Sequence, residues 1–183
     1  MAFNPILDEL PDTFNGVQVN TDFRQGLRFF AALADKEIEE REKSGIILRL
    51  FFPKEIPEPA SEVWPFIEYF ISGGDAEKSG STKARVFDWN ADAGRLYAAF
   101  LQTYRIDLRE IKMHWWIFLE LFRDLPEDTM LLKVIDIRGK KPPKYADNEY
   151  KRDLRKAQQA FAIEQGLADA KALGDTMRAW AGR

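Results

Sequence analysis

The sequence predicts a mostly α-helical fold: a compact bundle of about six helices, with a short N-terminal β-hairpin and an extended C-terminal helix. Three observations lead to this prediction. Apolar side chains recur every three or four residues through most of the chain, which is the period of an amphipathic helix. The segment 87–129 is dense in aromatic residues, most of them at that spacing. Glycine and proline interrupt the pattern at intervals that suit the ends of helices.

The first third of the chain is predicted to hold the hairpin and two helices. Asn15-Gly16 favours a two-residue turn because both positions tolerate positive φ. Asp22 can cap a first helix with an apolar stripe. A second helix is expected over about residues 37–51, although its apolar second half also suits a buried strand. The stripe of the first helix comprises Phe23, Leu27, Phe30 and Ala34.

Proline and glycine then delimit a third helix. Pro53, Pro57 and Pro59 end the second helix and form a stiff connector. Ser61 can cap the third helix, and Gly73-Gly74 can stop it. The polar segment 73–85, rich in glycine and serine, is predicted to be a loop.

Three further helices are expected between residues 88 and 137. Asp88 can cap the fourth helix, and Asp107 with Glu110 resembles a capping box that opens the fifth. The fifth helix would contain Trp115 and Trp116. Adjacent helical residues point about 100° apart, so both indoles can be buried only if this helix is covered on two sides. Either the helix is central to the bundle or one tryptophan lies at an interface. The sixth helix is expected over residues 130–137.

The C-terminal part reads as a linker followed by an arm. We divide the chain into a helical body (1–138), a linker (139–146) and a C-terminal helical arm (147–183). One long helix is expected from Asp147 to about Leu173, with a narrow apolar stripe. Such a helix docks weakly on the body or finds its burial in another chain. Contact with another copy and contact with a different partner are both open.

Charge is unevenly distributed along the chain. Residues 1–137 carry 16 basic and 24 acidic side chains, a net −8, whereas residues 138–156 carry 8 basic and 3 acidic ones, a net +5. The basic segment can bind an acidic partner or the body of a neighbouring copy. The acidic body disfavours nucleic acid as a partner because it would repel the phosphate backbone. The longest apolar stretch, residues 45–53, is too short to span a membrane.

No catalytic pattern emerges from the residue types. The chain has no cysteine and one histidine, His114, so a zinc site and a nucleophilic triad are both disfavoured. No glycine-rich phosphate loop occurs, and the acidic run Glu37–Glu42 suits a solvated helix face better than a metal site. We expect a binding protein that is not an enzyme and needs no cofactor. The candidate partner-binding residues lie on the fifth helix and the arm: Trp116, Tyr150, Leu154 and Phe161.

Several strings of residues resemble one protein family over about residues 14–138. They are Asn20-Thr21-Asp22-Phe23-Arg24, Phe87-Asp88-Trp89 with Asp92-Ala93, Tyr97-Ala98-Ala99-Phe100-Leu101 with Ile106-Asp107-Leu108, His114-Trp115-Trp116, and Leu125-Pro126-Glu127-Asp128-Thr129. The chain resembles the phage gene-product-fifteen family of tailed bacteriophages. It departs from the pattern at Arg105, where many relatives have glycine.

The resemblance implies a role in siphophage tail assembly. Proteins of this type resemble tail assembly chaperones, which bind the long, apolar tape-measure protein and keep it soluble until the tail-tube protein polymerises around it. The expected partners are therefore the tape-measure protein and, secondarily, the tail-tube protein, with several copies on one partner or a homo-oligomer. The expected location is the cytoplasm of the host bacterium, and the mature virion would lack the protein. The alternative is a tail connector or completion protein that stays in the virion. A nucleic-acid-binding regulator that uses residues 138–156 is a weaker third interpretation.

Overall fold

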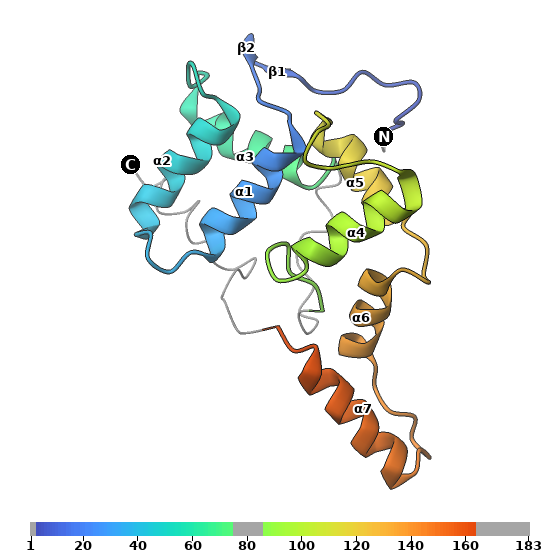
Figure 1. Ribbon diagram of the computed structural model, residues 1–183. Coiled ribbons are helices and arrows are strands. Elements are labelled where there is room, and N and C mark those ends of the chain that lie inside the picture. Colours follow the sequence, from blue (N-terminus) through green and yellow to red (C-terminus); the bar gives the residue numbers. More distant parts are fainter. Residues whose placement is uncertain (1–2, 75–85, 164–183) are drawn as a thin grey trace. The chain divides into compact units, whose positions relative to one another are not determined.

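The computed structural model describes residues 3–74 and 86–163 (Figure 1). A two-stranded antiparallel sheet precedes the helices, so the mostly α-helical prediction with an N-terminal hairpin is confirmed. The predicted loop at 73–85 and the arm beyond residue 163 lie largely outside the described residues. The elements are β1 (Thr13–Phe14), β2 (Val17–Gln18), α1 (Phe23–Ala34), α2 (Glu40–Phe51), α3 (Ala60–Ile71), α4 (Ala93–Tyr104), α5 (Trp115–Arg123), α6 (Met130–Gly139) and α7 (Asn148–Ala160).

The described chain forms two compact units, each built from separated stretches of sequence. The hairpin, α1, α2, α3 and α5 belong to unit 1, and α4, α6 and α7 belong to unit 2. The chain passes from one unit to the other at residues 111–112 and again at 123–124. This grouping cuts across the predicted body and arm, because α7 packs on α6 and the two belong to the same unit.

The core of unit 1 is aromatic and aliphatic. Helix α1 packs against both α2 and α5. Its buried face centres on Phe23, Phe29 and Leu33, whereas Leu27 and Phe30 of the predicted stripe are half-buried. The apolar second half of α2 is helical rather than a strand. The largest fully buried side chains of this unit are Phe23, Phe29, Ile47, Phe51, Phe52, Val63, Ile67, Phe70, Trp115 and Phe118.

The hairpin forms at the predicted turn and packs on α3. Asn15 and Gly16 take φ values of 47° and 79°, which a two-residue turn of this hand requires. The register pairs Thr13 with Gln18 and Phe14 with Val17. The ring of Phe14 stacks on that of Phe66 at a centroid distance of 4.3 Å. The hairpin is therefore fixed to unit 1 by an aromatic contact as well as by its own ladder.

The fifth helix begins later than the capping box predicts. Asp107 accepts a hydrogen bond from the Arg109 N–H and closes a single turn. Residues 112–114 then run extended, and α5 starts at Trp115. The Met113 carbonyl accepts from the Phe23 N–H at 2.9 Å, and the Trp115 N–H donates to the Thr21 carbonyl at 2.8 Å. These long-range bonds engage backbone groups that a continuous helix would have used.

The elements of unit 2 pack in chain order. Helix α4 contacts α6, and α6 contacts α7. Leu96 and Phe100 of α4 and Leu131 and Val134 of α6 are buried. Helix α7 ends at Ala160, well before the predicted end near residue 173. Its C-cap, Phe161, leaves the helical conformation and its carbonyl accepts a hydrogen bond from Arg138 Nε at 2.6 Å. A tertiary contact therefore accompanies the end of this helix.

Candidate binding surfaces

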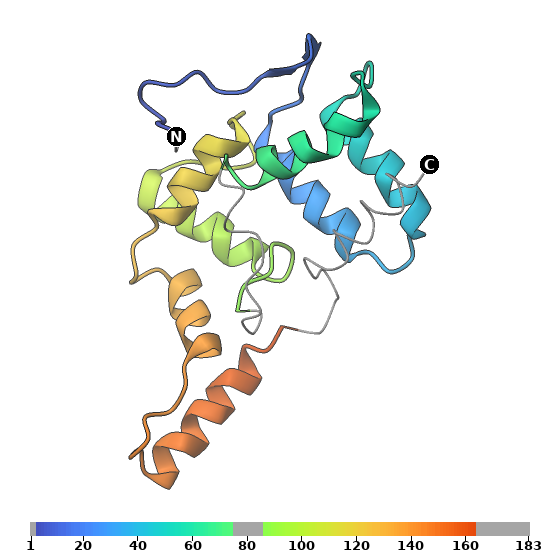
Figure 2. The same ribbon diagram turned by 180° about the vertical axis from the view of Figure 1, so that it is seen from behind.

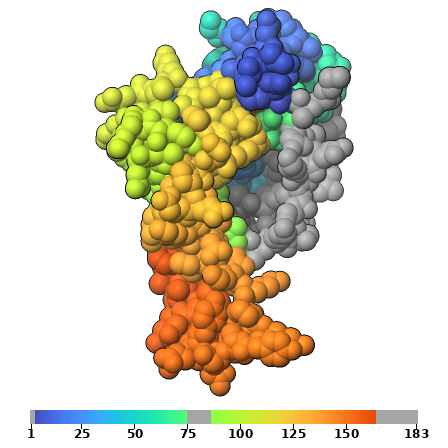
Figure 3. All heavy atoms as spheres, turned by 90° about the vertical axis from the view of Figure 1, so that its right-hand side faces the viewer, coloured from blue at the N-terminus to red at the C-terminus, as the bar shows by residue number. Residues whose placement is uncertain are grey.

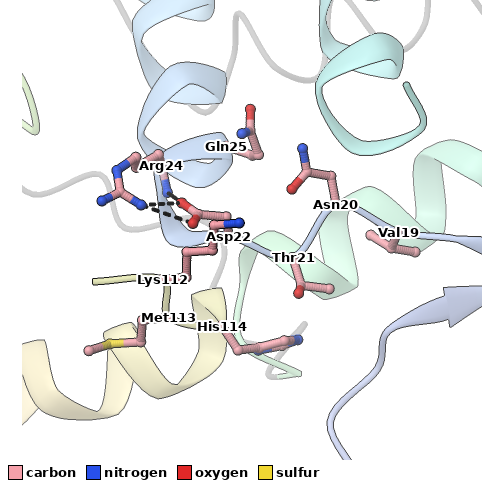
Figure 4. A pocket seen from close by; sticks show the side chains of 9 residues that line it. All are labelled: Val19, Asn20, Thr21, Asp22, Arg24, Gln25, Lys112, Met113 and His114. Carbon is pink, nitrogen blue, oxygen red and sulfur yellow. Dashed lines mark hydrogen bonds and ion pairs between the residues drawn. The ribbon is translucent and has the colours of Figure 1, made fainter. Parts of the chain in front are cut away.

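The starts of α1 and α5 are tied together in unit 1, and the two family-like strings that span these helix starts meet there (Figure 4). Asp22 caps α1 by accepting from the Arg24 N–H, and its carboxylate also pairs with the Arg24 guanidinium at 2.9 Å. His114 lies at the matching position before α5. The isolated antiparallel bridge between Asp22 and His114 holds the two caps side by side.

His114 caps α5 through its ring. Nδ1 accepts a hydrogen bond from the Trp116 N–H at 3.1 Å, so the proton of the neutral ring lies on Nε2. Nε2 lies 3.3 Å from the Pro11 carbonyl, to which it can donate. Burial lowers the pKa of His114, an effect that the Pro11 carbonyl and Asp12 partly oppose. Both ring nitrogens are thus engaged in holding backbone, which is a structural role rather than that of a general base.

An open hollow of about 550 Å³ lies beside these caps. Its wall carries two cationic side chains, Arg24 and Lys112, and one carboxylate, Asp22. The carboxylate is paired with Arg24, which offsets the positive charge. The hollow is lined by Val19, Asn20, Thr21, Asp22, Arg24, Gln25, Lys112, Met113 and His114 (Figure 4).

Both tryptophans of α5 are buried. Trp115 is 0% exposed and Trp116 2% exposed. The Trp115 Nε1–H donates to the Ile71 carbonyl at 3.0 Å, and the Trp116 Nε1–H donates to the Phe70 carbonyl at 2.7 Å. The end of α3 thus accepts from both indoles. Helix α5 is covered on two sides in unit 1, which is the first of the two alternatives for the tryptophan pair. The sequence-predicted contact Trp116 therefore lies in the core of unit 1.

The other three predicted contacts lie on α7 or at its end in unit 2. Tyr150 is 40% exposed, and Leu154 and Phe161 are half-buried. With Ala157 they recur every three or four residues and form one apolar stripe. No residue of α7 is fully buried. The structure brings these three residues together, whereas Trp116 belongs to the other unit.

A buried ion pair fixes the C-terminal end of α7. The carboxylate of Asp92, which is 0% exposed, accepts hydrogen bonds from both Nη atoms of Arg138, at 2.6 and 3.0 Å. The same guanidinium holds the Phe161 carbonyl, and Arg95 lies over the Phe161 ring at 5.6 Å. Gln158 Nε2 also donates to the Ile137 and Lys140 carbonyls. We call this group the α7 latch: Asp92, Arg95, Arg138, Gln158 and Phe161.

Sequence reasoning did not find the α7 latch. Asp92 does occur in a family-like string, but Arg138 appeared only as the first cation of a basic segment. A pairing across 46 residues leaves no local pattern. Asp92 and Arg138 become neighbours only when α4 and α6 pack together.

The side of α7 opposite the apolar stripe is basic. Tyr150 and Gln159 are nine residues apart, which places them half a turn apart on a helix. Lys151, Arg155 and Lys156 make no ion pair with any part of the chain that the structure describes, and Arg152 pairs only loosely with Glu149 and Asp153. The cations and their polar neighbours line a shallow hollow: Asn148, Lys151, Arg152, Arg155, Lys156 and Gln159.

Two general features concern the described residues alone. Within 3–74 and 86–163, no cluster of three or more histidine or acidic side chains is arranged to hold a metal ion. None of the described helices has the length and apolar character needed to cross a membrane.

Comparison with known proteins gives one match. The family model described as "Bacteriophage Gp15 protein" matches residues 6–163. This range spans the elements of both units. No curated protein and no solved structure matches the chain.

Proposed function

The chain belongs to the bacteriophage Gp15 family, and from that premise we propose that it is a tail assembly chaperone that binds the apolar tape-measure protein and keeps it soluble while the tail tube assembles. The proposed role is non-catalytic and needs no cofactor. It places the protein in the cytoplasm of the host bacterium, with several copies on one tape-measure chain. Neither a membrane nor a nucleic acid has a part in it.

The observation that carries the proposal, beside the family, is the surface of α7. A chaperone for an apolar helix needs an apolar stripe that a partner can reach. Helix α7 has such a stripe, with Tyr150 40% exposed and Leu154 half-buried. The α7 latch holds the C-terminal end of the helix on α6. A fixed amphipathic helix with an accessible stripe suits the binding of another amphipathic helix.

The engagement of the buried polar groups also supports a non-catalytic role. Both ring nitrogens of His114 bond to backbone, and the Asp92 carboxylate is saturated by two guanidinium groups and the Asp88 N–H. Such groups hold the fold together and are not poised to exchange protons with a substrate.

The first experiment is co-expression with the tape-measure protein of the same phage, followed by affinity capture of this chain from the soluble fraction. We expect the tape-measure protein to become soluble and to co-purify with several copies of the chain. If the tape-measure protein stays insoluble and the chain elutes alone, the chaperone proposal is wrong, and a tail connector retained in the virion becomes the leading candidate.

A matched pair of variants tests whether the apolar stripe of α7 makes the contact. Tyr150→Asp places a charge on the stripe, and Gln159→Asp places the same charge on the opposite side of the same helix. Capture of the tape-measure protein should fall with Tyr150→Asp and persist with Gln159→Asp. Equal capture by both variants would show that the apolar stripe of α7 does not make the contact. Circular dichroism of each variant checks that the helices are retained.

A further inference from the structure

The first described residues of unit 1 form a strap that packs on the core through the ring of Phe3. Phe3 packs against Trp116 with ring centroids 4.6 Å apart and planes at 75°. Residues 4–8 form a turn whose hydrogen bonds join Asn4 to Ile6, Leu7 and Asp8. Within the part of the chain that the structure describes, residues 3–10 make hydrogen bonds only among themselves. We call residues 3–10 the strap.

The strap is anchored at its far end by backbone. The Asp12 carbonyl accepts from the Val19 N–H at 2.8 Å, next to the hairpin, and from Gln18 Nε2 at 2.7 Å. Between this anchor and Phe3, Ile6 and Leu7 are 89% and 79% exposed. Figures 1 and 2 show the segment running from beside α5 to β1 along the outside of the helices, and Figure 3 shows it at the surface in dark blue.

The site under Phe3 is built by other residues. Hydrogen bonding to the Phe70 carbonyl at 2.7 Å fixes the Trp116 indole. Tyr69 of α3 packs edge-on against the same indole, with centroids 5.4 Å apart. Gly74 closes over the ring, because a Cβ there would lie 3.0 Å from Trp116 Cη2. The indole is therefore held in position by α3 and the residues after it. The surface on which the Phe3 ring packs is thus built by residues outside the strap.

We propose that the strap is displaceable and that the aromatic site on Trp116 and Tyr69 receives an apolar side chain from a helix of the partner when the strap lifts. The inference rests on the proposed function only for the identity of that partner. Phe3 stands in for the incoming side chain in the unbound chain. The strap is tethered nearby, so its effective concentration at the site is high. A stray apolar side chain would compete poorly, whereas a long apolar partner with several contacts to the chain would displace the strap.

The test uses the full-length chain and a labelled synthetic peptide with the sequence of residues 1–12. Phe3→Ala empties the site, and Ile6→Ala is the matched control because it shortens an exposed side chain of the same strap. Fluorescence anisotropy should show the peptide binding the Phe3→Ala chain at least about tenfold more tightly than the wild-type or Ile6→Ala chain, as loss of one competing aromatic contact requires. A peptide that itself carries Phe3→Ala should not bind.

Equal binding of the peptide to all three chains, or equal binding of both peptides to the Phe3→Ala chain, would overturn the proposal. Thermal melts of the variants check that Phe3→Ala still folds. Failure of the proposed function gives a different result: no variant would then capture the tape-measure protein, while the peptide result would stand by itself. If both hold, the Phe3→Ala chain should capture more tape-measure protein than the wild type.

Discussion

Gly26 sets the distance between α1 and α5. A Cβ on this residue would meet the Trp115 indole, with Cδ2 and Cζ3 only 2.6 Å away. Trp115 cannot yield easily because it is fully buried and its Nε1 is bonded to the Ile71 carbonyl. We expect Gly26→Ala to lower the free energy of unfolding by about 1–3 kcal/mol, since overpacking outweighs the better helix propensity of alanine.

Gly45→Ala is the control for that prediction. Gly45 also lies within a helix, but nothing lies within 4 Å of the position its Cβ would take. Urea denaturation should therefore show a gain of about 0.5–1 kcal/mol for Gly45→Ala. A loss at Gly45, or a gain at Gly26, would contradict the packing explanation.

Arg105 occupies a backbone conformation that favours glycine. It is the C-cap of α4, with φ 60° and ψ 26°. The left-handed conformation costs an ordinary residue about 1 kcal/mol or more. We expect Arg105→Gly to raise the free energy of unfolding by about 0.5–1 kcal/mol. Arg105→Ala removes the same charge and keeps the strain, so it should show no such gain in the same urea titration.

His114 should make stability fall as the pH drops below about 6.5. Burial lowers its folded-state pKa, so the unfolded chain takes up the proton first. The free energy of unfolding therefore falls as the pH drops from the pKa of His114 in the unfolded chain to its pKa in the folded chain. Below the folded-state pKa no further loss occurs. Protonation also removes the Nδ1 acceptor that caps α5. Because His114 is the only histidine, thermal melts between pH 7.5 and 5.5 isolate this effect. His114→Asn, which keeps a capping side chain, should flatten the dependence.

At the scale of elements, the α7 latch should decide whether α7 stays on α6. Removing one member of a buried ion pair costs roughly 3–5 kcal/mol when the other is left without a partner, and loss of Arg138 would leave Asp92 with Arg95 as its one guanidinium partner. We expect Arg138→Met to destabilise unit 2 by that order and to raise amide hydrogen exchange in α7 first, because the Phe161 carbonyl also loses its donor. Lys140→Met removes an exposed pair with Asp136 at 3.5 Å and should change little. Similar exchange in the two variants would show that the latch does not hold the helix.

The elements that sequence patterns predicted well are those whose signals are local. Asn15-Gly16 specified the hairpin turn, and Gly73-Gly74 specified the stop of α3, where both glycines take positive φ. The start of α5 and the end of α7 could not be read in this way. Backbone bonds from residues 21 and 23 engage the backbone of residues 113 and 115, so α5 starts only at Trp115, and Arg138 holds the carbonyl of Phe161. Those partners are far apart in the chain, so no window of sequence contains the signal.

At the scale of the molecule, apolar periodicity predicted the helical class but not the grouping of the helices. Two of the joins between the units, at residues 111–112 and 123–124, carry no cluster of glycine or serine that would mark a boundary. The predicted contact set had the same weakness. One helical stripe contains Tyr150, Leu154 and Phe161, so helical spacing groups these three residues correctly. Trp116 shares only its aromatic character with them, and it lies in unit 1.

The whole protein should be absent from finished particles if the proposed function is right. A chaperone of the tape-measure protein must leave as the tail-tube protein polymerises, because the tube takes its place on the same apolar chain. Quantitative mass spectrometry of purified virions should then find this chain far below one copy per particle, while lysates of infected cells contain it in excess over the tape-measure protein. A fixed number of copies per virion would instead identify a connector or completion protein. The tape-measure protein provides the internal standard, since it is counted in the same particles.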